Sequence, residues 1–93
     1  MTYGTYIRRL REARGLSINH FAQSIGISAA YWSRIEREQE KPPKDGLIEA
    51  AALVLETSLD EAYIQAGRLP PDLREHLGDI VAMWRSKEAR RGE

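Results

Sequence analysis

The sequence predicts an all-α fold, a bundle of five helices followed by a C-terminal amphipathic helix. Apolar residues recur at spacings of three and four along most of the chain, which is typical of helices with one buried face. No useful length of chain alternates apolar and polar residues, so no strand is predicted. With 93 residues, 42% of them hydrophobic, the chain is long enough for a single domain with one small core.

The first three helices are short, and glycine separates them. Helical spacing predicts the first helix over Thr5–Arg14, and the glycine that follows ends it. Ser17 is expected to cap the second helix, and Gly26 to stop it after two turns. Ser28 is expected to cap a third helix over Ala29–Glu38.

Two pairs of prolines divide the rest of the chain. Pro42-Pro43 predicts a loop, since proline breaks helices and keeps the preceding residue extended. A fourth helix is expected over Asp45–Leu55, with the aspartate as its cap. Ser58 with Glu61 predicts a capping box for a fifth helix that ends at Gly67. Pro70-Pro71 then begins the last helix, because proline is allowed in the first turn.

The second and third predicted helices form a helix-turn-helix unit, two short helices joined by a tight turn that contains glycine. Ala22 falls where the helices cross and is small enough for close approach. Gly26 takes the turn, which requires a left-handed backbone. Trp32 is interpreted as a core residue rather than a base-stacking one. The inward positions are Phe21, Ile25, Ile27, Trp32 and Ile35.

Composition excludes several classes of site. The chain has no cysteine, which excludes disulfides, thiolate zinc sites and thiol nucleophiles. His20 and His76 are far apart and lack a carboxylate pattern, so neither a metal nor another cofactor is predicted. No catalytic motif or glycine-rich phosphate loop is present, so we do not expect an enzyme. No apolar run approaches the roughly 18 residues of a membrane span, and no secretory stretch opens the chain, so the cytoplasm is expected.

Charge is unevenly distributed although the formal net charge is zero. Residues 1–44 hold eight basic and four acidic residues, a net charge of +4. Residues 45–79 hold two basic and eight acidic residues, a net charge of −6, and residues 80–93 carry +2. A cationic half on a neutral chain indicates one face that meets a polyanion, although chance segregation is the alternative on so small a protein.

Two segments, Ile7–Ser17 and Ile27–Arg37, resemble the lambda-repressor-like, Cro-type helix-turn-helix family, also called the xenobiotic-response-element family. The resemblance covers about residues 5–67. Residues 66–73 are similar to small stand-alone bacterial and phage regulators of this family. The resemblance implies a five-helix bundle that binds double-stranded operator DNA, usually as a dimer. We therefore expect a DNA-binding domain over residues 1–68 and a segment for dimerisation or self-docking over 69–93.

The chain departs from the family pattern at three places. Ile18 stands where members often have a glutamine that touches a phosphate, and Ala29-Ala30 where many have a long polar residue. Glu38 stands where glycine often follows the third helix. These departures put the family's usual DNA contacts in question.

Arg34 is the strongest candidate for reading a base, because its guanidinium can donate two parallel bonds to guanine. The alternative is a surface arginine that touches phosphate or its own domain. Ser28 can reach a base or serve only as a cap. The two alanines can pack on a thymine methyl or simply let the helix sit deep. The predicted base-reading residues are Ser28, Ala29, Ala30, Ser33 and Arg34.

A second set of residues is expected to contact phosphates, which sets register and affinity without reading sequence. The predicted phosphate contacts are Ser17, Asn19, His20, Tyr31, Arg37, Lys41 and Lys44. The alternative for each is a solvated polar side chain. Arg11 and Glu36 resemble a partly buried ion pair of the family that links the first and third helices, the alternative being two unrelated surface charges.

Five apolar residues, Leu73, Leu77, Ile80, Val81 and Trp84, recur at helical spacing in the last predicted helix. This stripe predicts a homodimer interface, with docking on the chain's own domain as the alternative. Together with what the family resemblance implies, this stripe leads us to expect a repressor that binds an inverted-repeat operator as a homodimer. The other hypothesis is a protein–protein interaction module, antitoxin-like or anti-repressor, that keeps the fold and acts through its acidic half and its last helix.

Overall fold

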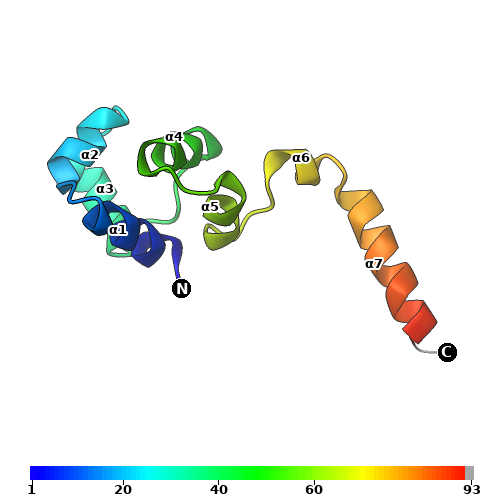
Figure 1. Ribbon diagram of the computed structural model, residues 1–93. Helices are drawn as coiled ribbons and strands as arrows, with labels where there is room; N and C mark the ends of the chain where they lie inside the picture. Colours follow the sequence, from blue (N-terminus) through cyan, green and yellow to red (C-terminus); the bar gives the residue numbers. More distant parts are fainter. Residues whose placement is uncertain (92–93) are drawn as a thin grey trace.

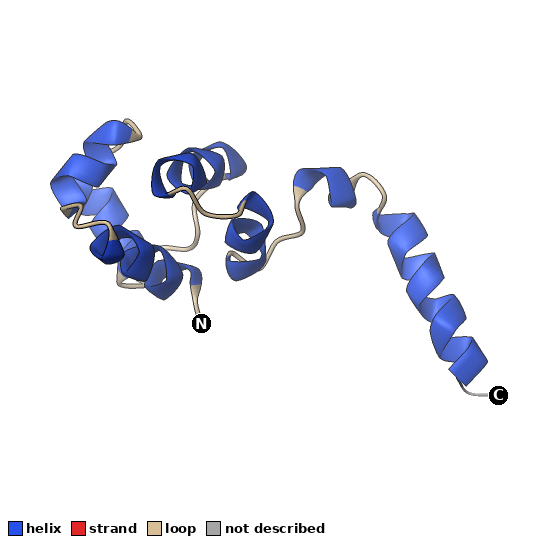
Figure 2. Ribbon diagram, in the orientation of Figure 1, coloured by secondary structure: helices blue, strands red, loops and turns tan. Residues whose placement is uncertain are grey.

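The computed structural model describes residues 1–91, which form seven helices (Figures 1 and 2). The first five helices form the bundle, and the last two lead away from it, so that the molecule measures 55 × 23 × 22 Å. Residues 92 and 93, the end of the predicted 69–93 segment, lie outside the described range. The helices are α1 (Tyr3–Ala13), α2 (Ile18–Ser24), α3 (Ala29–Glu36), α4 (Asp45–Leu55), α5 (Leu59–Gln65), α6 (Pro71–Arg74) and α7 (Leu77–Arg91).

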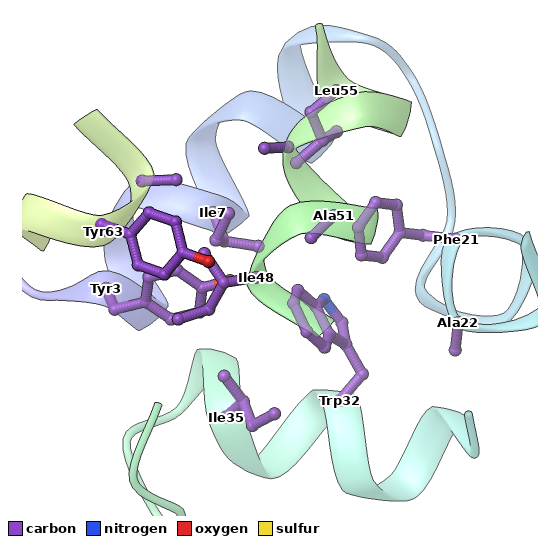
Figure 3. Close-up of a cluster of buried hydrophobic side chains, with 12 residues drawn as sticks. Tyr3, Ile7, Phe21, Ala22, Trp32, Ile35, Ile48, Ala51, Leu55 and Tyr63 are labelled. Atoms are coloured by element: carbon purple, nitrogen blue, oxygen red, sulfur yellow. The ribbon is translucent and has the colours of Figure 1, made fainter. Parts of the chain in front are cut away.

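The expected all-α bundle with a C-terminal helix is confirmed. Each helix of the bundle contributes to a single core, which lies between α1, α3 and α4 with α2 and α5 at its sides (Figure 3). None of the helices described is long and apolar enough to cross a lipid bilayer. The buried hydrophobic residues are Tyr3, Ile7, Phe21, Ala22, Trp32, Ile35, Ile48, Ala51, Ala52, Leu55, Ala62 and Tyr63.

The helix-turn-helix unit is built as its sequence predicts. Ala22 is buried between α2 and α3, and Gly26 takes the turn with φ +75°. The rings of Phe21 and Trp32 lie 4.9 Å apart between centroids and are tilted by 48°. Trp32 is fully buried, so its interpretation as a core residue is confirmed. Close packing of these two rings joins the helices, since aromatic pairs add to the free energy gained by burial.

The predicted serine caps are also confirmed. The hydroxyl oxygens of Ser17, Ser28 and Ser58 accept hydrogen bonds from backbone N–H groups three residues later. Each bond satisfies one of the free donors of a helix's first turn. Gly67 follows α5 with φ +74°, the left-handed conformation that glycine adopts at low cost.

Two predicted helix ends are wrong, and each has a local cause. α1 begins at Tyr3 instead of Thr5, because the hydroxyl of Thr2 accepts a bond from the Thr5 N–H and caps the helix two residues earlier. α3 ends at Glu36 instead of Glu38, because Glu38 has a left-handed backbone with φ +63°. The Glu38 carboxylate accepts hydrogen bonds from the Thr2 and Thr5 hydroxyls, so it lies at the N-terminus of α1.

Two predicted caps are corrected. Asp45 is the first residue of α4 and not its cap, because its carboxylate accepts bonds from Arg68 and Arg74 instead. The capping box of α5 is only half formed. The Ser58 hydroxyl accepts from the N–H of Glu61, whereas the Glu61 carboxylate accepts from the side chain of Gln65.

The single last helix predicted from Pro70-Pro71 is divided into α6 and α7 by a turn at Glu75 and His76. Leu73 therefore lies on α6, and the apolar stripe predicted to begin there is continuous only from Leu77. The turn is hydrogen-bonded, since the N–H of His76 donates to the carbonyl of Leu73 and that of Ile80 to the carbonyl of His76.

Gly4 marks the closest approach of α1 to α3. A Cβ on Gly4 would lie 2.5 Å from the carbonyl oxygen of Ile35 and 2.8 Å from that of Glu36. Both atoms belong to the backbone, so neither can move without shifting the end of α3. The neighbouring residue Tyr3 is buried, and burial raises the pKa of its phenol because it disfavours the charged phenolate.

We expect Gly4→Ala to lower the free energy of unfolding by about 1–3 kcal/mol, because the added methyl forces the two backbones apart. Urea unfolding followed by circular dichroism measures the change. The matched control is Gly46→Ala on α4, where a Cβ meets nothing within 4 Å and stability should stay the same or rise slightly. Equal behaviour of the two variants would show that α1 does not need this close approach.

Candidate nucleic-acid interface

The candidate interface is the outer face of α3. Ala30 and Arg34 are exposed and Ser33 is half-buried, whereas Trp32 and Ile35 point into the core. A helix repeats every 3.6 residues, so Trp32 and Ile35 share the side of α3 that faces the core. Ala30, Ser33 and Arg34 therefore share the opposite, outer side. The hydroxyl of Ser28 accepts a bond from the N–H of Tyr31 and so acts as a cap, and Ala29 is partly buried against the core.

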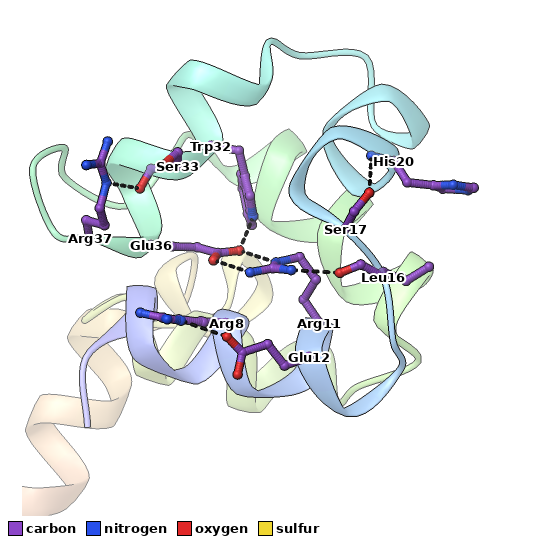
Figure 4. Close-up of polar contacts among 10 residues, drawn as sticks. All are labelled: Arg8, Arg11, Glu12, Leu16, Ser17, His20, Trp32, Ser33, Glu36 and Arg37. Carbon is purple, nitrogen blue, oxygen red and sulfur yellow. Dashed lines mark hydrogen bonds and ion pairs between the residues drawn. The ribbon is translucent and has the colours of Figure 1, made fainter.

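A buried ion pair joins α3 to α1 behind this face (Figure 4). Arg11 Nε donates to Glu36 Oε2 at 2.8 Å, and Arg11 Nη2 donates to Glu36 Oε1 at 2.9 Å. Arg11 Nη1 donates to the carbonyl of Leu16 at 2.7 Å, and Trp32 Nε1 donates to Glu36 Oε2 at 2.7 Å. The side chains of Arg11 and Glu36 are only 9% and 3% exposed. The hydrogen bonds that Arg11 donates to Glu36 raise the pKa of the guanidinium, because they stabilise its charged form.

The residues expected to contact phosphates come from α2 and its cap, from α3 and from the segment that follows α3. Ser17 is the cap of α2, and its hydroxyl accepts a hydrogen bond from the N–H of His20 (Figure 4). Asn19 and His20 are exposed in the first turn of α2. Arg37 follows α3, where its Nε lies 3.4 Å from the carbonyl of Ser33. Lys41 and Lys44 are exposed in the loop between α3 and α4. The ring of Tyr31 packs partly against the core.

Two charged residues of this region were not singled out from the sequence. Glu40 Oε2 lies 3.8 Å from Arg34 Nε, so an acid stands beside the candidate base reader. Arg8 lines a hollow beside α1 and α3, together with Ser33 and Arg37. Its Nε donates to Glu12 at 2.8 Å, a bond that lowers the pKa of Glu12. The face is thus less cationic than its arginines and lysines alone suggest.

The apolar stripe of α7 lies away from this face and is open to solvent. Leu77 is 46% exposed, Val81 37% and Trp84 61%, and Leu73 on α6 is 41% exposed. Ile80 is half-buried. The stripe is therefore not covered by the five-helix bundle (Figure 1). Within residues 1–91 no group of three or more histidine, aspartate or glutamate side chains is placed to hold a metal ion.

A family model described as a helix-turn-helix domain matches residues 2–62. The chain belongs to this helix-turn-helix family. Its relatives are transcriptional regulators and not enzymes. An HTH-type transcriptional regulator of Mycobacterium tuberculosis is 33% identical over 78 residues, 84% of this chain and 55% of that protein. The HTH-type transcriptional repressor RghR of Bacillus subtilis is 36% identical over 66 residues, 71% of this chain and 49% of that protein. The chain thus spans about half the length of these relatives.

Solved structures agree with the family. The biofilm regulator SinR, crystallised in complex with DNA, superposes with a TM-score of 0.62 at 28% identity, covering 66% of this chain and 97% of that one. A SinR–SinI complex superposes with a TM-score of 0.63 over 99% of this chain and 100% of that one, at 19% identity, which supports the fold alone. The resemblance of this helix-turn-helix chain to the lambda-repressor-like family is confirmed.

We expect Glu36→Gln to lower the free energy of unfolding by about 3–5 kcal/mol, because the buried guanidinium of Arg11 loses its compensating charge. Thermal unfolding followed by circular dichroism measures this. The control is Glu12→Gln, which removes the same charge from an exposed pair, with side chains 57% and 54% accessible, and should change the melting temperature little. If Glu36→Gln melts like the parent, the pair does not hold α3 against α1.

Proposed function

We propose that this chain binds double-stranded DNA sequence-specifically and represses transcription, as a homodimer on an inverted repeat. The observation that carries the proposal is the outer face of α3, held from behind by the Arg11–Glu36 pair and bordered by cationic residues. Two relatives support it. SinR was crystallised with DNA, and RghR is described as a repressor. In the proposed complex α3 lies in the major groove, where base edges can be read.

We propose individual roles that are compatible with the positions of the side chains. Arg34 reads a base and Ser33 assists it, since both are polar and belong to the outer face of α3. Ala29 and Ala30 allow close approach and contact a thymine methyl. Ser28 acts mainly through its cap. The proposed phosphate contacts are Ser17, Asn19, His20, Tyr31, Arg37, Lys41 and Lys44.

We propose that two segments of the chain have different functions. Residues 1–68 bind DNA, and residues 69–93 join two copies through the exposed residues Leu77, Val81 and Trp84, with Ile80 beside them. Leu73 on α6 extends this surface. A two-fold axis between the copies sets two reading helices about 34 Å apart, one turn of DNA, and so requires a palindromic site.

The second candidate function is a protein–protein interaction module. It is favoured by the same exposed stripe and by the net charge of −6 over residues 45–79, which can receive a cationic partner. The dependence of binding on salt concentration distinguishes the two candidate functions. DNA binding should weaken steeply with salt, by about 0.9 in log–log slope for each phosphate neutralised. Binding to one protein with little dependence on salt would favour the module.

The DNA contacts can be tested on a site selected from random DNA by the full chain. We expect Arg34→Ala to cost about 1–3 kcal/mol on that site and to relax one base position, because the bidentate contact is lost. Lys44→Ala should weaken binding to all sequences alike and reduce the salt slope by about one unit. Arg85→Ala is the control, because it removes a positive charge from α7 and not from the proposed DNA contacts. Equal loss on the selected site and on random DNA for Arg34→Ala would exclude Arg34 as a base reader.

The dimer can be tested by sedimentation of the full chain at tens of micromolar. We expect Val81→Glu to convert dimers to monomers, because it places a charge in the middle of the apolar stripe. Ser86→Glu is the matched control, since the 3.6-residue period puts Ser86 on the opposite side of α7. A chain ending at Arg68 should also be monomeric. Dimers that persist in Val81→Glu and in the shortened chain would show that α7 is not the dimer element.

A further inference from the structure

The carboxylate of Asp45 connects three parts of the chain. Arg74 on α6 binds it bidentately, with Nη1 at 2.8 Å from Oδ2 and Nη2 at 3.2 Å from Oδ1. Arg68, which follows α5, brings its Nη1 to 3.3 Å from the same Oδ1. The hydrogen bond from Arg74 lowers the pKa of Asp45, so the group is ionised at neutral pH. We name Asp45, Arg68 and Arg74 the aspartate clamp.

The two arginines of the aspartate clamp also contact other groups of the chain. Arg74 Nε donates to the carbonyl of Leu69 at 2.8 Å, and its guanidinium lies 5.6 Å from the ring centre of Tyr63, a buried residue of α5. Arg68 donates to the carbonyls of Pro42 and Pro43, in the loop between α3 and α4. Planar guanidinium groups held at several points leave little freedom of orientation.

The segment between α5 and α7 is therefore attached to the bundle and is not a free linker. Pro70 is buried, and Pro71 begins α6, so the backbone there is restricted in φ. Beyond α6 the hydrogen-bonded turn at Glu75 and His76 leads directly into α7. Nothing else described in the bundle covers the exposed stripe of α7, so the direction of α7 depends on how α6 is anchored.

We propose that the aspartate clamp sets the direction in which α7 leaves the bundle, and through it the half-site spacing that a dimer accepts. The second part rests on the proposed homodimer on DNA. Each added base pair moves a half-site by about 3.4 Å and rotates it by about 34–36°. A rigid connection tolerates such a shift poorly, whereas a flexible one accommodates it. Arg74 acts as a positioning residue, because it touches neither the outer face of α3 nor the stripe of α7.

The first test needs no DNA. The chain has no cysteine, so spin labels can be attached to cysteines introduced at Gln23 on α2 and Ser86 on α7 of the full chain. Dilution with unlabelled chain confines the measured distance to one copy. We expect one narrow distance distribution for the parent and a broad one for Arg74→Ala and Asp45→Asn. The distribution should also broaden near 1 M salt, where the Debye length falls to about 3 Å, because the clamp's side chains are 30–39% exposed.

The control for this test is Asp72→Asn, which removes the same charge from an exposed position of α6. Its distribution should match that of the parent. If Arg74→Ala and Asp45→Asn also match the parent, the clamp does not set the direction of α7 and the inference is wrong. Circular dichroism melting of each variant shows that the bundle is folded during the measurement.

The second test uses the two half-sites selected by the parent chain, separated by spacers one or two base pairs longer or shorter. The parent should prefer its own spacing by about tenfold, and Arg74→Ala by about twofold or less, with single half-site affinity unchanged. An unaltered preference in a dimeric Arg74→Ala would overturn the inference while leaving the proposed dimer intact. Monomeric parent chain or a site without symmetry would instead overturn the proposed dimer, and with it the role of the clamp in spacing.

Discussion

The carboxylate of Glu36 lies on the inner side of α3 and accepts three hydrogen bonds, two from Arg11 and one from the indole of Trp32. A carboxylate at this depth is stable only when its charge is compensated and its oxygens are bonded. Both donors must therefore be in place together, which fixes the rotation of α3 about its own axis. A rotation by one residue, about 100°, would turn Glu36 towards solvent and Arg34 towards the core. The buried pair thus determines which residues α3 presents outside.

A second constraint acts at the C-terminal end of α3. The backbone of Gly4 packs against the carbonyls of Ile35 and Glu36, and Glu38 continues the chain in a left-handed conformation. For a residue other than glycine that conformation costs about 1–2 kcal/mol. The Glu38 carboxylate accepts hydrogen bonds from the Thr2 and Thr5 hydroxyls at the N-terminus of α1, where the helix dipole favours a negative charge. α1 therefore supports α3 at two points, through Arg11 in its last turn and Gly4 in its first.

The sequence predicted what depends on neighbouring residues. The caps at Ser17, Ser28 and Ser58 and the glycine turn at Gly26 are local chemistry, and the inward positions of α3 follow from helical period. Pairing of Arg11 with Glu36 came only from the family resemblance. What the sequence did not predict depends on distant partners. The Asp45 carboxylate does not cap α4 because it binds two arginines, 23 and 29 residues later in the chain. Gly4 packs against the end of α3, more than 30 residues away, where a side chain would not fit. The break between α6 and α7 was missed because the apolar period continues across it.

The composition of α3 supports the homodimer in the proposed function. Two alanines at the start of the helix offer no hydrogen bonds from their side chains, and the Ser28 hydroxyl is engaged in its cap. Base recognition then rests chiefly on Ser33 and Arg34, and Glu40 stands beside the arginine. One good bidentate contact discriminates by only about 1–3 kcal/mol. In this proposal a single bundle discriminates weakly between base sequences. Two joined copies combine the binding free energies of two half-sites in one binding event. The core of the bundle is complete without α7, so the exposed apolar surface of that helix is available for the proposed dimer interface.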